Sequence, residues 1–193
     1  MVKLSTNIFM FNGAMPENLI ERFLQIRTDA AHDDRINLDE VDMDALSAFN
    51  DFFLQSIEPQ IMDDYFSIYD LEKGIGYNSS SETVKGLKEY VSAKWRNIFM
   101  LRYTDEIDQF FDGNTHWDFS GFTAVVGLTS TYLGGLLGFP RQQIECRIER
   151  GDVIVFAGGL THPHYVTQVT RGTRDVLVAQ SWMPTQDDYK PLI

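Results

Sequence analysis

The sequence has little of several residue types, and each shortage excludes a class of protein. One of its 193 residues is a cysteine, which excludes a disulfide framework and a cysteine-rich zinc site. Only 16 residues are basic against 28 acidic ones, giving a net charge of −12, whereas a nucleic-acid-binding protein needs a basic footprint. We find no secretory leader and no run of about 18 apolar residues, and therefore expect a cytoplasmic protein with no membrane or nucleic-acid partner. Histidine is also scarce, with four residues: His32, His116, His162 and His164.

The chain contains enough apolar side chain to form a core. Hydrophobic residues make up 44% of it and aromatic residues 13%, which excludes global disorder. Residues 16–26 and 46–68 repeat large apolar side chains at spacings of three and four, which predicts amphipathic helices, the second either one helix or two that break near Pro59. We expect their aromatic stripe to pack on a sheet. Residues 72–88 are rich in glycine and serine and predict a long loop, either a lid over the substrate or a surface loop.

The second half of the chain predicts strands. Short apolar runs, separated by glycine and proline and without helical segments between them, occupy residues 95–103, 122–128, 144–148, 153–156, 165–170 and 176–179. This order predicts an antiparallel sandwich or barrel. The sequence therefore predicts one α+β or mainly β domain over residues 1–193, with helical support and a loop at 1–92 and a β-rich core at 93–193.

His116 and Asp118 are the first candidates for chemistry. Residues two apart in a strand point to the same side, so the imidazole and the carboxylate would project together. His162 and His164 are the other histidines of the β-rich half, and either could supply a third ligand. Two histidines and one carboxylate on one face of a metal form the facial triad of non-haem Fe(II) oxygenases. A surface strand end with a polar pair is the alternative interpretation of His116 and Asp118 alone.

An arginine follows the second pair of histidines. Arg174 comes after the sequence Arg-Gly-Thr at 171–173, which predicts a turn that opens a new strand and returns Arg174 towards His164. A guanidinium group can bind a carboxylate through two parallel hydrogen bonds. A metal triad with this arginine suits an oxo acid that chelates the metal at one end and is anchored by its far carboxylate.

Several motifs occur together in one order from about residue 99 onwards: Leu101-Arg102-Tyr103, His116-Trp117-Asp118, Gly134-Gly135, Gly151-Asp152, His164-Tyr165-Val166, Gly172, Arg174 and Trp182. In these the chain resembles the 2-oxoglutarate and Fe(II)-dependent dioxygenases, specifically the prolyl 4-hydroxylase-like branch. The resemblance implies a double-stranded β-helix (a cupin-like jelly-roll) with N-terminal helices packed on one sheet. It also implies an enzyme that uses Fe(II), 2-oxoglutarate and O2, and it leaves room for ascorbate as a reductant.

The resemblance assigns three residues to the metal. His116, Asp118 and His164 would bind the iron, and the Pro-His-x-Val pattern favours His164 over His162 as the third ligand. Related halogenases have a small residue in place of the carboxylate, so Asp118 implies hydroxylation of an sp3 carbon.

The resemblance assigns further residues to the co-substrate. Arg174 would bind the distal carboxylate of 2-oxoglutarate, Tyr103 would offer it a hydroxyl, and Trp182 would lie on the last core strand near the iron. Relatives often carry a tyrosine just after the strand at 122–128. That tyrosine is missing here, which leaves Thr129 or Thr131 as its replacement.

The resemblance leaves the substrate open. It implies a prolyl residue in a peptide or protein, and an acidic enzyme would favour a basic peptide. A free amino acid, such as proline or lysine, is the alternative within this class. Outside the class, a non-catalytic jelly-roll binding module and a hydrolytic zinc enzyme stay open, although neither explains why Arg174 accompanies the triad.

Overall fold

The computed structural model describes residues 1–30, 35–38, 41–61, 95–105 and 115–181. The predicted loop at 72–88 and Trp182 lie outside these ranges. The strands are β1 (Val2–Ser5), β2 (Ile8–Phe11), β3 (Arg35–Asn37), β4 (Trp95–Thr104), β5 (Phe122–Gly127), β6 (Tyr132–Gly134), β7 (Leu137–Phe139), β8 (Ile144–Cys146), β9 (Val153–Ala157), β10 (Tyr165–Val166) and β11 (Val169–Ser181). The helices are α1 (Glu17–Asp29) and α2 (Met43–Phe52), and α2 continues into the π-helical turn η2 (Phe53–Ile57).

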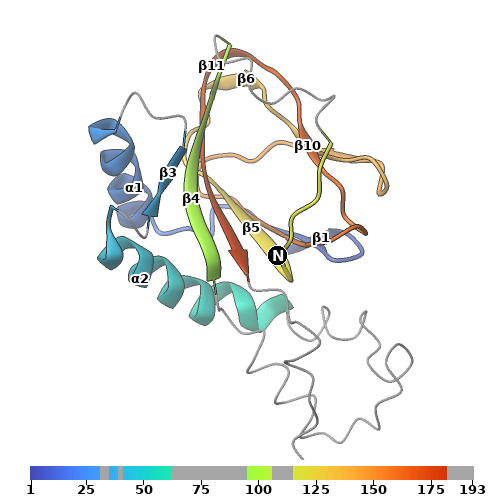
Figure 1. Ribbon diagram of the computed structural model, residues 1–193, viewed down its shortest axis with the longest axis horizontal. Coiled ribbons are helices and arrows are strands. Elements are labelled where there is room, and N and C mark those ends of the chain that lie inside the picture. The colour runs from blue at the N-terminus through green and yellow to red at the C-terminus, as the bar shows by residue number, and fades with distance from the viewer. Residues whose placement is uncertain (31–34, 39–40, 62–94, 106–114, 182–193) are drawn as a thin grey trace, which may run out of the picture.

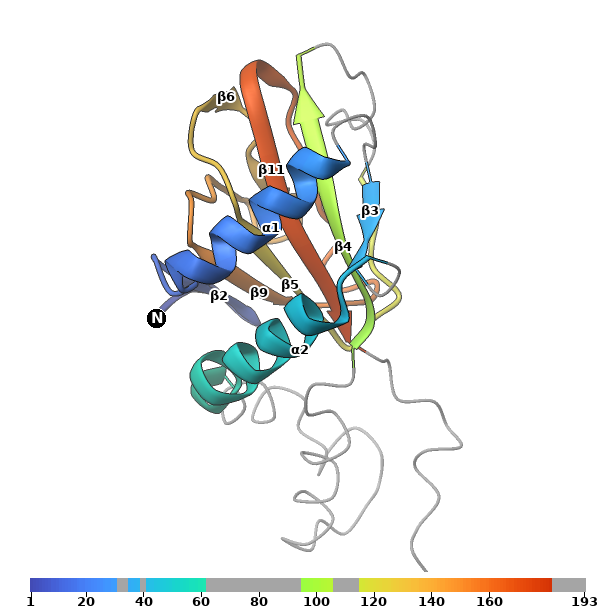
Figure 2. The ribbon, with the colours of Figure 1, turned by 90° about the vertical axis from the view of Figure 1, so that its left-hand side faces the viewer.

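Two antiparallel sheets face each other (Figure 1). The larger sheet has the order β1-β2-β9-β5-β11-β4-β3, with β6 also paired to β11, and the smaller has the order β10-β7-β8. The neighbours in each sheet come from distant parts of the chain, since β11 lies between β5 and β4 and β2 pairs with β9. Both helices lie on the outer face of the larger sheet (Figure 2). The predicted jelly-roll with helices on one sheet is therefore confirmed.

Side-chain alternation along the central strands divides the core into two layers. In β11, Leu177 belongs to the layer under the helices, whereas Val176 belongs to the layer between the two sheets. Strands covered on both faces are apolar at nearly every position, which explains the unbroken apolar runs of β5 and β9. By the same alternation Arg174 lies on the side of Val176, between the sheets, and Asp175 lies on the side of Leu177, under the helices.

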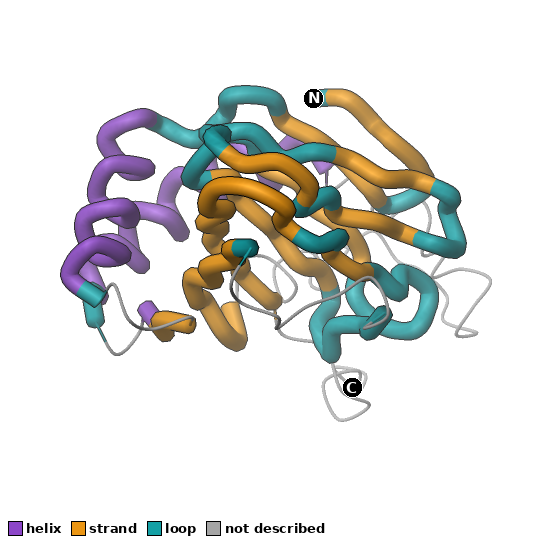
Figure 3. The backbone as a smooth tube through the Cα atoms, turned by 90° about the horizontal axis from the view of Figure 1, so that it is seen from above, coloured by secondary structure: helices purple, strands orange, loops and turns teal. Residues whose placement is uncertain are grey.

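The aromatic stripe of the second helix packs on the sheet, as predicted. Phe53 stacks on Phe122 of β5 with ring planes 8° apart and centroids separated by 5.7 Å. Seen from above, the helices group on one side of the strands (Figure 3). Helical backbone runs through Pro59 to residue 61, so there is one helix here. The π-helical turn comes just before Pro59, which cannot donate to the carbonyl four residues earlier.

The N-terminal part is not helical throughout, and this corrects the predicted division at residue 92. Strands β1, β2 and β3 all belong to the larger sheet, and every residue of β2 is buried. A four-residue strand is too short to show a period in the sequence, and its partner β9 lies far along the chain. Within the described ranges, no helix is long and apolar enough to cross a membrane.

Candidate active site

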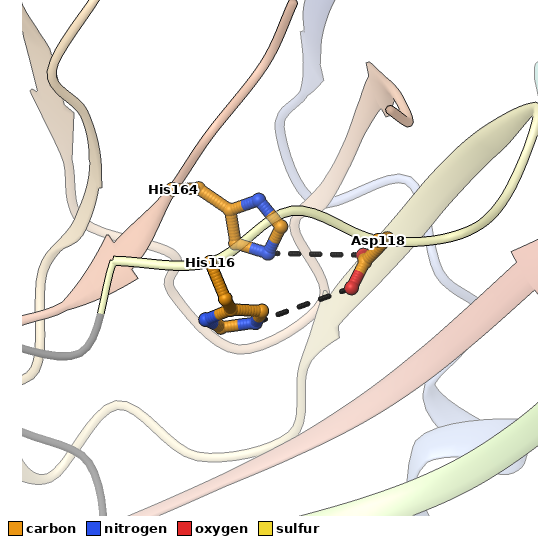
Figure 4. Close-up of side chains that lie close together, drawn as sticks. All are labelled: His116, Asp118 and His164. Atoms are coloured by element: carbon orange, nitrogen blue, oxygen red, sulfur yellow. Dashed lines mark ion pairs between the residues drawn. The ribbon is translucent and has the colours of Figure 1, made fainter. Parts of the chain in front are cut away.

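Three side chains at one end of the space between the sheets form a possible metal site. The ligand atoms of His116, Asp118 and His164 all lie within 4.8 Å of one another (Figure 4). Nε2 of His164 is 3.7 Å from Oδ2 of Asp118, and Nε2 of His116 is 4.0 Å from Oδ1. Two bonds of about 2.1 Å from one ion span at most about 4.2 Å. Both separations are therefore compatible with a shared ion.

A short backbone pairing joins the two histidines. The N–H of His116 donates to the carbonyl of His164 at 3.0 Å, and the N–H of His164 donates to the carbonyl of His116 at 2.8 Å. The two ring centroids are 4.5 Å apart. This antiparallel bridge connects the segment before β5 with the segment before β10, and so it brings ligands from distant parts of the chain to one place.

Asp118 is buried and held in one orientation. Oγ1 of Thr123 donates to Oδ2 of Asp118 at 2.6 Å, and Ser120 Oγ lies 3.1 Å from that hydroxyl. The N–H of Gly159 donates to the Asp118 carbonyl at 2.8 Å. A carboxylate that accepts one hydroxyl keeps further lone pairs for an ion. Thr123 was not identified from the sequence. It follows Asp118 by an odd number of residues, and such a separation does not predict that two side chains face the same side of a strand.

His164 is held in the tautomer that metal binding needs. Its Nδ1 lies 3.1 Å from the carbonyl oxygen of His162, which can only accept, so Nδ1 carries the proton and Nε2 keeps its lone pair. Burial lowers the pKa of His164 and favours the neutral ring, although the Asp118 carboxylate acts in the opposite direction. His116 is different, since its side chain is 51% exposed, and the site opens towards solvent on that side.

The neighbouring His162 is turned away from the site. Its Nε2 lies 3.0 Å from the carbonyl oxygen of Thr6, and its Nδ1 lies 2.9 Å from the hydroxyl of Thr161. Burial lowers the pKa of His162. Because both ring nitrogens bond elsewhere, only His164 of the pair is placed beside Asp118.

Arg174 offers buried donors between the sheets. Its side chain is 1% exposed, and its Cζ lies 4.9 Å from the ring centroid of Tyr103, the residue opposite it on β4. Nε and Nη1 of Arg174 have no hydrogen-bond partner among the residues that the structure describes. Burial of unpaired, charged N–H groups costs stability. The donor set therefore fits a carboxylate, which can accept from both nitrogens at once.

Gly135 and Tyr103 shape the space around this guanidinium. Gly135 has φ +62°, and a Cβ there would lie 2.8 Å from Cδ of Arg174. Any residue other than glycine would therefore clash with the Arg174 side chain. Burial raises the pKa of the Tyr103 hydroxyl, Arg174 opposes this, and the Asp118 charge adds to it. Tyr103 therefore keeps its proton and can donate a hydrogen bond.

The route by which Arg174 reaches the interior differs from the prediction. Residues 171–174 do not form a turn, because β11 runs without interruption from Val169 to Ser181. Gly172 lies inside the strand with φ +81°, next to an irregularity in the pairing of β11 with β6. A glycine in a strand often marks such an irregularity. Arg174 faces inwards because of its position in the strand alternation.

Thr129 is bonded to the backbone, which argues against its predicted place at the co-substrate. Its Oγ1 donates to the carbonyl of Thr173 at 2.9 Å and accepts from the N–H of Asp175 at 2.9 Å. A hydroxyl has one proton, so Thr129 cannot also donate to a bound carboxylate while this bond exists. Thr131, the other candidate replacement, is exposed.

No protein-family model and no curated protein sequence matches the chain, but solved structures match its fold. The viral collagen prolyl hydroxylase vCPH from Paramecium Bursaria Chlorella virus-1 has a TM-score of 0.58 at 11% identity, over 92% of this chain and 91% of that one. A prolyl-4-hydroxylase from Pseudomonas putida has a TM-score of 0.55 at 14% identity, over 94% and 95% of the two chains. NgTET1 in complex with 5mC DNA has a TM-score of 0.50 at 17% identity, over 90% and 71%. The chain therefore has the jelly-roll fold of these solved structures, among them two prolyl hydroxylases.

Proposed function

We propose that this protein is a 2-oxoglutarate- and Fe(II)-dependent dioxygenase that hydroxylates an sp3 carbon. One observation carries the proposal: a His-Asp-His cluster and a buried arginine with two unpaired donors lie in the same space between the sheets. A metal accounts for the cluster alone, and an anion accounts for Arg174 alone. An oxo acid that chelates a metal and carries a second carboxylate accounts for both. The structure of vCPH in complex with 2OG, which shares the fold at a TM-score of 0.54, supports this co-substrate.

Different residues would bind the metal and the distal carboxylate of the co-substrate. Nε2 of His116, Nε2 of His164 and the Asp118 carboxylate would hold Fe(II), leaving further coordination positions open. With 2-oxoglutarate and O2, the bound iron would supply the oxidising chemistry that replaces a C–H bond by C–OH.

The side chains of the protein would bind the co-substrate and hold the metal ligands in their orientations. Arg174 would donate two parallel hydrogen bonds from Nε and Nη1 to the distal carboxylate, and Tyr103 would donate its hydroxyl proton to the same region. Both groups are buried, so their interactions with an anion are stronger than in water. The Thr123 hydroxyl fixes the Asp118 carboxylate, and the rings of Phe156 and Phe139, with centroids 4.8 Å and 6.1 Å from that of His164, exclude water from the buried side of the triad.

We further propose a prolyl residue of a peptide or protein as the substrate. Two of the similar structures are prolyl hydroxylases, and the net charge of −12 favours a neutral or basic peptide. The exposed side of His116 leaves room for a large substrate, and the neighbouring Trp117 and Phe119 are 42% and 58% exposed. A free amino acid is the alternative. Nucleic acid, to which NgTET1 is bound in its structure, is disfavoured by the acidic charge.

Binding under anaerobic conditions tests the activity. Addition of Fe(II) and 2-oxoglutarate should give a visible charge-transfer band, and air should then yield succinate. His116→Ala should lose both signals. His162→Gln is the matched control, because His162 bonds to Thr6 and Thr161, and it should keep both. A band with no succinate would indicate a binding module, and turnover with zinc in the absence of an oxo acid would indicate a hydrolase. Either result would overturn the proposal.

Mass spectrometry tests the substrate. Proline-containing peptides of basic and acidic composition, and free proline and lysine, would be incubated with the enzyme, Fe(II), 2-oxoglutarate and air. We expect one added oxygen on a prolyl residue, with a preference for the basic peptides. Oxygen added only to a free amino acid would contradict the peptide assignment and leave the oxygenase assignment intact.

A further inference from the structure

Strands β5 and β11 stop pairing at the position of Arg174. Their register runs from Gln180 opposite Thr123 to Val176 opposite Gly127. One more main-chain bond follows, from the N–H of Leu128 to the carbonyl of Asp175 at 3.0 Å. Beyond this point the main chain of β5 offers β11 no further bond in the described structure. The next residue of β11 is Arg174, the proposed anchor of the distal carboxylate.

The Thr129 hydroxyl continues the pairing across this point. It donates to the carbonyl of Thr173 and accepts from the N–H of Asp175. These two groups belong to the peptide units on either side of Arg174. A hydroxyl is both donor and acceptor, so one side chain supplies two bonds that, in a continued antiparallel ladder, main-chain groups of two different residues would supply.

The opposite side of β11 is held by an ion pair. Arg102 of β4, which faces Asp175 across the strands, donates from Nε and Nη2 to its two carboxylate oxygens at 2.8 Å and 2.9 Å. Nε of Arg27 in α1 lies 3.6 Å from Oδ1 of the same carboxylate. Asp175 is buried under the helices, on the face of the sheet opposite to Arg174. By the strand alternation, Asp175 and the opposite Arg102 lie on the helix side of the sheet.

We propose that Thr129 is a positioning residue for the co-substrate: it fixes the backbone on both sides of Arg174 and so places the guanidinium for the distal carboxylate, while Asp175 and Arg102 anchor the other edge of the strand. This inference rests on the proposed function. A displacement of about 1 Å of a binding group can cost as much as 100-fold in rate, and a guanidinium fork must match a carboxylate in direction as well as distance. The Thr129 contribution should therefore appear in the binding of dicarboxylates, not in metal binding.

The test compares two oxo acids on three variants. Thr129→Val is nearly isosteric and loses both bonds, Thr129→Ser keeps the hydroxyl, and Thr170→Val makes the same substitution at an exposed position of β11. Each protein, loaded with Mn(II), is titrated calorimetrically with 2-oxoglutarate and with 2-oxopentanoate, which lacks the distal carboxylate. We expect Thr129→Val to weaken 2-oxoglutarate binding by about tenfold or more and 2-oxopentanoate binding by less than twofold. Thr129→Ser and Thr170→Val should bind both acids like the unchanged protein.

The possible outcomes separate the inference from the function on which it rests. Equal 2-oxoglutarate affinity in Thr129→Val and the unchanged protein overturns the positioning role. An equal loss for both oxo acids also overturns it, because the effect would then not pass through Arg174. If the unchanged protein binds Mn(II) but binds both oxo acids equally well, the result contradicts the proposed function itself and not only the role of Thr129. Amide hydrogen exchange of the ligand-free protein gives a second readout: exchange at residues 173–175 should be faster in Thr129→Val and unchanged in Thr170→Val.

Discussion

Two histidines separated by one proline have different roles because they bond to different parts of the chain. The His162 ring bonds to Thr6 and Thr161, which fixes it towards the turn between β1 and β2. The backbone of His164 pairs with that of His116, so its ring lies beside Asp118. The His162 carbonyl still contributes, because it sets the tautomer of His164. The pair thus acts as one ligand and one support.

Thr123 should govern the affinity of the metal site. Loss of a group that orients a metal ligand typically costs about 10- to 100-fold in metal affinity. We therefore expect Thr123→Val, which removes the 2.6 Å bond to Asp118, to weaken Mn(II) binding by a factor in this range, measured by calorimetry. Thr123→Ser keeps a hydroxyl and should restore most of the affinity. Unchanged binding in Thr123→Val would show that the carboxylate is held by other contacts.

Cys146 should be unreactive in the folded protein. Burial raises the pKa of its thiol from 9.0 to about 11, and the charge of Arg174 opposes this only in part. Because the thiolate is the reactive form, alkylation by iodoacetamide at pH 8 should be about 100-fold slower in the native protein than in the unfolded one. Equal rates would show that the thiol is exposed.

The same pKa shift has a consequence for stability. The unfolded thiol loses its proton at a lower pH than the folded thiol, so its contribution to the free energy of unfolding is complete below about pH 9 and declines as the pH rises towards 11. Denaturant unfolding should show this decline, and Cys146→Ser should show less of it.

At the scale of elements, the start of α2 depends on one carboxylate. Asp42 accepts from the N–H of Ala45 at 2.9 Å, and it is also bonded by the Arg22 side chain of α1 at 2.7 Å and 3.0 Å. These bonds lower the pKa of Asp42, with the Ala45 N–H as the largest cause. The residue therefore caps one helix and ties it to the other.

Asp42→Ala should lower the free energy of unfolding by about 1 kcal/mol at neutral pH, the usual contribution of a helix cap. Asn can still cap the helix, so Asp42→Asn should recover part of the loss. Because the folded pKa is lowered, the stabilisation exists above the ordinary value of 3.8 and is lost as the pH falls through the folded value. Urea unfolding at pH 7 and pH 3 would test this, and a difference between Asp42→Ala and the unchanged protein that grows at pH 3 would contradict it.

Elements with a strong local pattern could be predicted, and elements without one could not. The apolar spacing predicted α1 and α2, and the continuous apolar runs predicted β4, β5 and β9, because residues of one face must be apolar to be buried. The turn expected at residues 171–174 was wrong. Glycine permits a turn and a strand irregularity equally well, and only the pairing with β6 decides between them.

At the scale of the whole molecule, the larger sheet depends on the first residues of the chain. Strand β2 lies between β1 and β9, and its Ile8 and Phe9 are fully buried. Strand β1 lies at the edge of the sheet. Removal of β1 would leave a shorter sheet with β2 at its edge, whereas removal of both strands would expose β9 and the apolar layers on both of its faces.

Two truncations should therefore behave differently. A protein that begins at residue 6 should fold, with only a reduced melting temperature. A protein that begins at residue 12 should be insoluble or unfolded by circular dichroism. Phe9→Ala gives a milder version of the second change, with an expected loss of about 3–5 kcal/mol in the free energy of unfolding. A folded protein that begins at residue 12 would show that β2 is not part of the core.

The sequence by itself determined the fold class and the chemistry of the candidate ligands. These properties are local, because side-chain period indicates strands and residue type gives imidazole, carboxylate and guanidinium groups their ligand atoms and donors. The tertiary structure alone decided that Thr129 bonds to the backbone around Arg174, that Thr123 holds Asp118, that the His162 ring bonds to Thr6, and that β2 pairs with β9. Each of these depends on contacts between segments far apart in the chain, and such pairings are set by the free energy of the whole packed sheet, which no local pattern contains.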